Sequence, residues 1–585
     1  MNRSYFSIVC RNSKEYFKKS SWRGILEQVI ALLLALSLVG EVIITKILFD
    51  NISNITSFQK IAKNLILLIS VIILQQLLSG FGQYLLSRVS YTNMGKFMVE
   101  FQLKLSRFPL IYFENTEFLD KVTKAKECLE YESLGHFASI CLKMITHYSV
   151  YLLAIAGFLI YTSPLLVIIL LLSFIPAILA QIIKGKYYID LENAIASEKR
   201  RCDSYKKSII STSSYKETRI LGAYHYFFNI FNDSLHILTE KRWKIEKKTA
   251  FLEIGINSLV FIGLGISMYI LFSQMMTGQI SIGMFSALFV TLSDLFDIMD
   301  EMVSYNIGQG SEVIGQVASF YDLMDMEEVE EDCINPNFNE GIVAKNIFFK
   351  YPSRSSDALS DVSLNINKGE TVAIVGENGS GKSTFVNNLI GLYNPYKGLL
   401  KIGGIEHKGN LSRGNFKNIS AVFQDFQKYK LTLAENVIIS DIGKLENFEL
   451  ISTLLKQVGF YHPSAKLTTV LSPEFSGIDL SIGQWQRLAI ARGLYRSFDF
   501  IILDEPTASI DPIEESKIFE NFENIVANRT AVIITHRMAS AKFADRIIVM
   551  DKGRIVECGS HEDLLKNKGK YYTMWQAQAK WYQDY

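Results

Sequence analysis

The chain has 585 residues, of which 49% are hydrophobic, and its 60 basic and 59 acidic residues leave a net charge of +1. This length exceeds one ordinary core, so several domains are expected, and the composition is more apolar than soluble proteins usually are. The near-neutral charge gives no indication of nucleic-acid binding, and the six cysteines, without a CxxC pair, favour a reducing compartment.

The first 24 residues are basic and aromatic, and they lack an apolar signal core followed by a small-residue cleavage site. We expect residues 1–24 to form an amphipathic elbow segment at the inner membrane surface. An ordinary solvated helix is the alternative.

Six apolar runs follow. A helix needs about 20 mostly apolar residues to cross the hydrocarbon of a bilayer, so these runs predict an all-α transmembrane domain over residues 25–310. A large helical soluble core is the alternative. The predicted spans are Ile25–Leu48, Ile61–Leu86, Phe137–Tyr161, Leu165–Ile183, Phe251–Phe272 and Gly283–Met302.

The connections between the spans differ in charge. Lys and Arg gather in the N-terminal segment and in Lys184–Lys248, whereas Ser273–Ile282 carries no charge. Because basic loops stay on the cytoplasmic side, both termini are expected inside, with two long cytoplasmic excursions. These excursions, Ser87–His136 and Lys184–Ala250, read as helices that continue from the membrane and return to it.

The sixth span is unusual in carrying Asp294, Asp297 and Glu301 at a spacing of three and four, which places them on one helical face. Carboxylates that face lipid are costly, so we expect them to line a wet translocation path that favours cationic cargo. The alternative is that the span starts earlier and the acids lie in its cytoplasmic extension.

The composition changes after the last span. An acidic stretch ending in Pro and Gly reads as a linker over residues 311–340. From about Ile342, short apolar strands alternate with helical stretches, which predicts an α/β domain over residues 341–585.

A phosphate-binding loop lies in this second domain. The strand Thr371–Gly376 leads into GENGSGKST and then into a helical pattern, which is the P-loop arrangement. Backbone N–H groups would face phosphate, the lysine would add a charge, and Ser383 would bind Mg²⁺. The residues predicted to hold the nucleotide are Gly376, Asn378, Gly379, Ser380, Gly381, Lys382, Ser383 and Thr384.

Two further strands end in polar residues. FDFIILDEP delivers Asp504, expected to hold Mg²⁺ through water, and Glu505, expected to polarise the attacking water. A surface pair of acids is the alternative. The strand in TAVIITHR ends in His536, the last residue but one of this stretch, which we interpret as a hydrogen-bond partner of a γ-phosphate rather than an ordinary structural histidine.

LSIGQWQRLAIARGL, Leu480–Leu494, with the P-loop and LDEPTASID, resembles the nucleotide-binding domain of ABC transporters over nearly all of residues 340–585. With six spans ahead of it, the whole chain resembles an ABC exporter half-transporter. The resemblance implies ATP and Mg²⁺ as cofactors and an ATP hydrolase coupled to transport.

The resemblance also assigns roles to single residues. Tyr351 matches the aromatic residue that stacks on adenine, and Gln424 matches the glutamine that senses Mg²⁺ and connects to the membrane part. Asp511 matches the loop that crosses the dimer interface. Ser481, Gly483 and Gln484 belong to the signature, whose serine and glycine face a nucleotide held by the other subunit. Ile482 departs from the glycine that is more common there.

One copy of each motif implies two chains in the functional unit, either a homodimer or a heterodimer with a degenerate partner. Tyr112–Asp120 and Tyr215–Leu221 look like the coupling helices through which ATP-driven closure reaches the spans in an alternating-access cycle.

VFQDFQKYKLTLAENV and SPEFSGIDLSIGQWQ look most like the exporters of lantibiotics and other ribosomal peptides, in the bacterial cytoplasmic membrane. Lipid or multidrug export is one alternative, and an ATP-gated channel or sensor is another.

Overall fold

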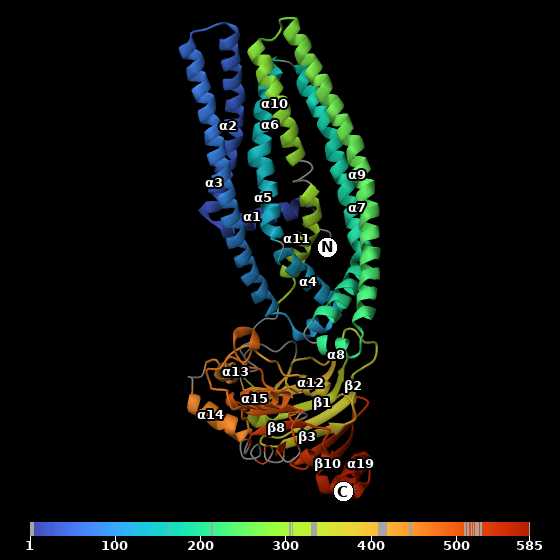
Figure 1. The fold of residues 1–585 in the computed structure, drawn as a ribbon. Coiled ribbons are helices and arrows are strands. Elements are labelled where there is room, and N and C mark those ends of the chain that lie inside the picture. Colours follow the sequence, from blue (N-terminus) through green and yellow to red (C-terminus); the bar gives the residue numbers. More distant parts are fainter. Residues whose placement is uncertain are drawn as a thin grey trace. The chain divides into compact units, whose positions relative to one another are not determined.

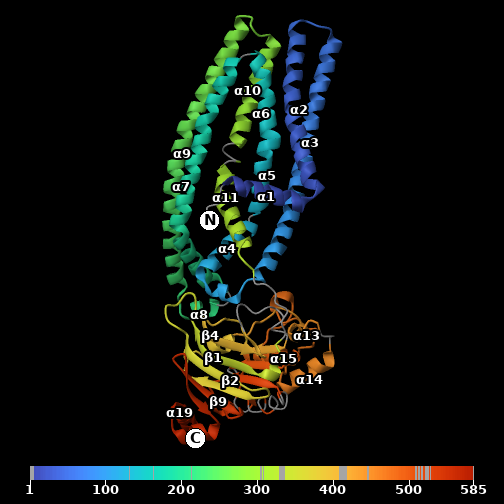
Figure 2. The same ribbon diagram turned by 180° about the vertical axis from the view of Figure 1, so that it is seen from behind.

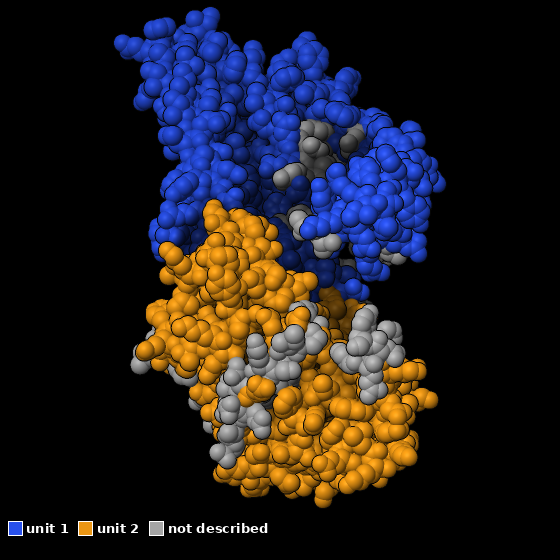
Figure 3. Space-filling view, turned by 60° about the horizontal axis from the view of Figure 1, so that its bottom comes forward, with its two compact units in different colours: residues 1–105, 120–326 blue, residues 106–119, 327–585 orange. Residues whose placement is uncertain are grey.

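The computed structural model describes residues 5–130, 132–162, 164–211, 214–302, 306, 308–328, 336–406, 418–443, 447–507, 510–511, 514–515, 518, 520, 526 and 529–583. The chain forms two compact units, coloured separately in Figure 3: Met1–Leu105 with Asp120–Met326, and Ser106–Leu119 with Glu327–Tyr585. Part of the first excursion therefore belongs to unit 2. The domain limits at residues 24, 310 and 340 stay predictions, and residues 329–335 of the predicted linker lie outside the described part.

Unit 1 is built of helices. In Figures 1 and 2, α2 runs beside α3 and α7 beside α9, and these pairs pack along their lengths. The helices are α1 (Tyr5–Ser20), α2 (Trp22–Ser53), α3 (Phe58–Leu105), α4 (Thr116–Glu130, which begins in unit 2), α5 (Ser133–Lys143), α6 (Ser149–Thr162), α7 (Pro164–Ile210), α8 (Tyr215–Ile220), α9 (Tyr224–Met276), α10 (Ile282–Asp300) and α11 (Gly308–Met324).

Several of these helices have the length and composition to cross a membrane. Among the described residues they are Trp22–Ser53, Phe58–Leu105, Ser133–Ile160 and Tyr224–Met276, and Ile282–Leu295 is a shorter apolar helix. The fourth predicted span lies in α7, where many side chains are outside the described part. Helices α3, α7 and α9 are each long enough to contain a predicted span together with part of a predicted excursion.

The apolar side chains of α3 are largely uncovered in this chain. Only 6% of its most apolar window is buried, and Ile66, Ile73 and Leu77 are each more than half exposed. Contiguous apolar surface of this extent is rare on monomeric soluble proteins. The helix keeps its backbone groups bonded internally, as a lipid environment requires.

The start of α10 is defined by two side-chain contacts. The Ser281 hydroxyl accepts the N–H of Met284 at 3.1 Å, and Asp50 Oδ1 at the end of α2 accepts the N–H of Gly283 at 3.0 Å. The helix therefore begins at Ile282, one residue before the predicted Gly283. At about 1.5 Å per residue, Asp294 lies roughly 18 Å along it.

Unit 2 contains two sheets, ordered β2-β1-β4-β5 and β10-β9-β3-β8-β7-β6. The strands are β1 (Ile342–Phe349), β2 (Leu359–Ile366), β3 (Thr371–Gly376), β4 (Lys397–Ile402), β5 (Ile405–Glu406), β6 (Ile419–Val422), β7 (Phe500–Asp504), β8 (Thr530–Ile534), β9 (Arg546–Asp551) and β10 (Arg554–Gly559). The helices are α12 (Lys382–Leu389), α13 (Leu433–Ile438), α14 (Phe448–Gln457), α15 (Ile482–Tyr495), α17 (Met538–Ala541), α18 (His561–Asn567) and α19 (Lys570–Gln583). The predicted helical first part and α/β second part are confirmed.

The central strands of the larger sheet are parallel and in a fixed register. Ile374 of β3 lies opposite Ile534 of β8, which lies opposite Asp504 of β7. Strands β7 and β8 are buried throughout, as expected for a parallel sheet covered on both faces. Because the strands are parallel, the loops after β3, β6, β7 and β8 leave from one edge of the sheet.

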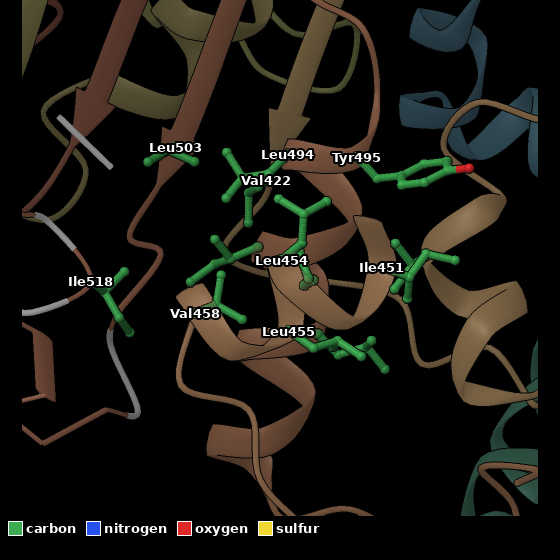
Figure 4. Packing of buried hydrophobic residues seen from close by; sticks show 14 of the residues in the cluster. Val422, Ile451, Leu454, Leu455, Val458, Leu494, Tyr495, Leu503 and Ile518 are labelled. Carbon is green, nitrogen blue, oxygen red and sulfur yellow. The ribbon is translucent and has the colours of Figure 1, made fainter. Parts of the chain in front are cut away.

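A cluster of buried hydrophobic residues packs α14 and α15 against this sheet (Figure 4). Ile451, Leu454 and Leu455 of α14 lie in this cluster with Leu494 and Tyr495 of α15. The strands contribute Val422 and Leu503 to the same cluster. This packing, which includes Leu480 and Trp485, holds the start of α15, where the predicted signature lies, against the rest of unit 2.

Replacing Ile451, which is completely buried, by Ala is expected to destabilise unit 2 by roughly 2–5 kcal/mol, because it removes buried carbons and leaves a cavity. Thermal unfolding of the purified protein would measure this as a lowered midpoint. Ile442→Ala, at a side chain that is 79% exposed, is the control. Equal midpoints for the two variants would contradict the assigned packing.

Candidate functional site

The loop between β3 and α12 is shaped by close approaches of its backbone. A Cβ atom at Gly376 would lie 2.3 Å from the carbonyl oxygen of Met550, so only glycine fits there. Gly381 precedes α12 with a φ of 101°, a left-handed conformation that side chains disfavour. The loop thus passes close to the sheet before α12 begins.

Lys382 folds across this loop. Its Nζ donates to the carbonyl oxygens of Gly376 at 2.9 Å and Glu377 at 3.0 Å. Burial lowers the pKa of Lys382, and the nearby carboxylates of Glu505 and Asp504 oppose that shift. A buried cation beside a helix N-terminus is suited to an anionic group such as phosphate.

Asp504 ends the buried strand β7 and is only 7% exposed. Burial raises the pKa of its carboxyl, and a hydrogen bond from Ser383 partly lowers it. Its Oδ1 atom has no hydrogen-bond partner in the described part of the chain. A buried carboxylate oxygen with a spare lone pair, next to a serine hydroxyl, fits a hard cation such as Mg²⁺.

Glu505 is held on several sides. Its N–H donates to the Ile534 carbonyl at 2.9 Å, and its φ of 46° is unusual for a residue other than glycine. Gln424 Nε2 donates to Glu505 Oε2 at 2.9 Å, and His536 Nδ1 lies 3.1 Å from Oε1. The structure therefore brings three predicted catalytic residues together, although they come from three different strand ends.

These residues line a cavity of about 1340 Å³. This exceeds the roughly 300–1,000 Å³ of ordinary ligand pockets, so the cavity is large enough to admit a nucleotide. Of the predicted residues, those along its wall are Tyr351, Gly376, Asn378, Gly379, Gly381, Lys382, Ser383, Thr384, Gln424, Glu505 and His536. Asp504 and Ser380 lie buried behind the wall, and the Ser380 carbonyl accepts the N–H of Gly553 at 2.9 Å.

Tyr351 lines the cavity and contacts other residues of its wall. Its hydroxyl lies 3.1 Å from Thr384 Oγ1, and its ring packs edge-on against Tyr393. The Tyr393 hydroxyl donates to Glu114 Oε1 at 2.8 Å; burial and this hydrogen bond both raise the pKa of Tyr393. Glu114 lines the cavity as well, and its carbonyl accepts a hydrogen bond from Ser353 Oγ at 2.9 Å.

Several lining residues were absent from the sequence-based prediction. Ser353 and Arg354 follow Tyr351 closely and could have been suspected from that position alone. Glu114 and the pair Met574 and Gln578 carry no local signal. The full set of such residues is Glu114, Ser353, Arg354, Ser356, Asp357, Ala358, Glu377, Lys552, Gly553, Met574 and Gln578.

The predicted signature residues lie elsewhere. Ser481, Gly483, Gln484 and Asp511 are not among the described residues along the cavity wall. Ser481 caps α15 in a reciprocal pair: its hydroxyl accepts the N–H of Gln484, whose side chain accepts the N–H of Ser481 at 2.9 Å. The neighbouring Ile482 is 60% exposed. This helix N-terminus is thus presented on the surface.

The family model described as "ABC transporter" matches residues 359–508. The subtilin transport ATP-binding protein SpaT of Bacillus subtilis is 31% identical over 542 residues, which cover 89% of this chain and 87% of that protein. The chain belongs to the ABC transporters. This ABC transporter is a multi-pass membrane protein that uses ATP and couples its hydrolysis to transport.

Two further likenesses bear on this ABC transporter. The ATP-dependent lipid A-core flippase of Wigglesworthia glossinidia brevipalpis is 30% identical over 370 residues, covering 62% of this chain and 63% of the flippase. The solved structure of a bacterial Atm1-family ABC exporter with ATP bound has a TM-score of 0.81 at 21% identity, covering 96% of this chain and 98% of that chain. The second likeness shows that the transporter has the fold of this exporter family.

Glu505→Gln is expected to lower ATP turnover by about 10²- to 10⁴-fold while leaving ATP binding largely intact, since the carboxylate acts on water and not on the phosphates. Steady-state phosphate release and equilibrium nucleotide binding by the full-length protein would measure the two effects. Glu449→Gln, in the first turn of α14, is the control. Hydrolysis at the wild-type rate in Glu505→Gln would remove Glu505 from this role.

Proposed function

We propose that this chain is a peptide exporter of the bacterial cytoplasmic membrane that works as a homodimer. The observation that carries the proposal is the likeness to the subtilin transport protein, which extends through both the membrane and the nucleotide parts. The flippase likeness covers less of the chain, and it makes lipid export the second candidate.

The position of the signature supports two composite ATP sites. Ser481 and the first turn of α15 are turned to the surface, while the P-loop and Glu505 line a cavity of the same domain. A helix N-terminus with its cap is suited to phosphate. In the proposed dimer, the signature of one copy faces the nucleotide held by the other, with Asp511 at the interface, and ATP draws the two domains together.

Within each site, Ser383, Asp504 and Gln424 would hold Mg²⁺, which supplies positive charge to the phosphate oxygens when bound. Lys382 and the loop N–H groups would bind and orient the phosphates. Glu505, positioned by its hydrogen bond from Gln424, would take up the proton of the attacking water, and His536 would contact the γ-phosphate.

Coupling to the membrane part is supported by the segment Ser106–Leu119, which belongs to unit 2. Ile111 packs against the core of the sheets, and Glu114 reaches both Tyr393 and the cavity wall. This segment is continuous with α3 on one side and α4 on the other. A change at the nucleotide site therefore acts directly on chain that leads into the spanning helices, as alternating access requires.

The proposed orientation has both termini in the cytoplasm. The basic residues of Lys184–Lys248 favour this side for the excursions. Nucleotide domains must also meet cytoplasmic ATP.

Ser481→Asp is expected to lower hydrolysis by at least about a hundredfold, because aspartate still caps α15 but places a like charge beside phosphate across the interface. Ser481→Thr, which keeps the cap without the charge, should retain most activity. Both should bind ATP like the wild type when nucleotide binding is measured on dilute protein. A loss of ATP affinity in Ser481→Asp under these conditions would contradict the composite site.

The cargo is tested in proteoliposomes that contain the full-length protein. ATP-dependent movement of a cationic lantibiotic-type peptide is compared with movement of a fluorescent lipid, and Glu505→Gln liposomes serve as the control. Movement of the peptide supports the proposal. Movement of the lipid alone would favour the flippase, and ATP hydrolysis without movement of either would favour a channel or sensor.

Asp294→Asn combined with Asp297→Asn is expected to reduce cationic peptide transport about tenfold while basal hydrolysis persists. Asp294 and Asp297 both lie inside α10 and are three residues apart, so their carboxylates share one helical face. The same assay measures both activities, and Asp233→Asn on the exposed part of α9 is the control. Unchanged transport of the cationic peptide by a well-folded double variant would contradict a role of these carboxylates in transport.

A further inference from the structure

The C-terminal helix α19 reaches the nucleotide cavity. Met574 and Gln578 line its wall together with His536 and Glu505. Helix α19 packs against α17, the short helix that follows His536, and against α18. None of the nucleotide-binding motifs found in the sequence includes a residue of this helix.

The helix is anchored firmly enough to position other groups. The Glu557 carboxylate accepts the N–H groups of Lys570 and Tyr571, the first two residues of α19. Tyr571 is completely buried, and its hydroxyl lies 2.7 Å from His561 Nδ1. Met574 and Trp575 pack against a core that includes residues of β3, the strand that leads into the P-loop.

Gln578 uses both ends of its side-chain amide on the loop that carries His536. Its Nε2 donates to the carbonyl oxygen of His536, and its Oε1 accepts the N–H of Met538 at 2.9 Å. Met538 is the first residue of α17, and the preceding Arg537 supplies no side-chain cap. The glutamine therefore satisfies a backbone donor and a backbone acceptor that flank Arg537.

The imidazole of His536 depends on that backbone for its place. Its side chain is 48% exposed, and Nδ1 lies 3.1 Å from Glu505 Oε1. Because a half-exposed ring is held only loosely by packing, the direction of its Cα–Cβ bond largely decides where the ring lies. That direction follows the backbone around His536, which is held by the two bonds to Gln578 and by the Arg537 N–H, which donates to Thr535 Oγ1 at 2.9 Å.

We propose that Gln578 is a positioning residue for ATP hydrolysis, which holds the main chain around His536 so that the imidazole stays beside Glu505. This inference rests on the role given to His536 in the proposed function. Gln578 acts through His536, so its loss should slow turnover more than it weakens ATP binding.

The first test is Gln578→Ala in the full-length protein, with ATP hydrolysis measured in lipid nanodiscs. We expect kcat to fall about tenfold and KM for ATP to change less than about twofold. Gln576→Ala is the matched control, because Gln576 is exposed on the same helix and bonds only locally to Tyr572 among the described residues. Wild-type kcat in Gln578→Ala, or an equal loss in both variants, would overturn the proposal.

Gln578→Glu is a second variant that keeps the proposal testable if Gln578→Ala does not fold. The carboxylate can still accept the N–H of Met538 but cannot donate to the carbonyl of His536. We expect the same loss of kcat with an unchanged thermal midpoint. Wild-type kcat in this variant would show that the bond to His536 has no part in turnover.

A double-mutant cycle separates positioning from general stabilisation. In a His536→Ala background, Gln578→Ala should cause no further loss, because its effect is transmitted through the missing imidazole. If Gln578→Ala lowers kcat in the His536→Ala background by the same factor as in the wild-type background, the proposal is overturned. If His536→Ala alone hydrolyses ATP like the wild type, the role of His536 in the proposed function fails first, and the role of Gln578 falls with it.

Discussion

The parallel register of β6, β7, β8 and β3 is the constraint on which the nucleotide site depends. It places the ends of these strands at one edge of the sheet, so residues from distant parts of the sequence meet there. The hydrogen bond from the Glu505 N–H to the Ile534 carbonyl follows directly after the last pair in this ladder. A shift of one residue in either strand would turn the side chains proposed to be catalytic to the opposite face.

The site holds polar groups that the protein alone leaves under-satisfied. Among the described residues, neither Asp504 Oδ1 nor Ser380 Oγ has a hydrogen-bond partner although both are buried, and Lys382 is bonded to carbonyl oxygens of its own loop. Burying such groups costs free energy unless partners are supplied. Phosphate and a divalent cation would supply those partners, so ligand binding relieves a cost already present in the fold.

The same domain also receives contributions from outside its predicted nucleotide-binding motifs. The segment Ser106–Leu119 brings Glu114 to the cavity wall, and the C-terminal helix α19 brings Gln578 to the loop of His536. The first contact connects the nucleotide site with chain that continues into long apolar helices. The contact of Gln578 supports the His536 loop from α19, a helix that packs against residues of β3. Site geometry, membrane connection and C-terminal support are thus built into one unit.

The sequence alone determined the order of the two parts, the apolar spans, the P-loop, Asp504 with Glu505, His536 and the signature. Each depends on local physics, since a strand, a glycine turn and a helix start must follow one another within a few residues. Only the tertiary structure decided that Glu505 is held by Gln424 and His536, and that Glu114 and Gln578 join them. Those contacts join residues from about 30 to nearly 300 positions apart in the sequence. No local sequence pattern can predict them, because they form only when the sheets pack and bring distant strand ends, the segment Ser106–Leu119 and α19 together.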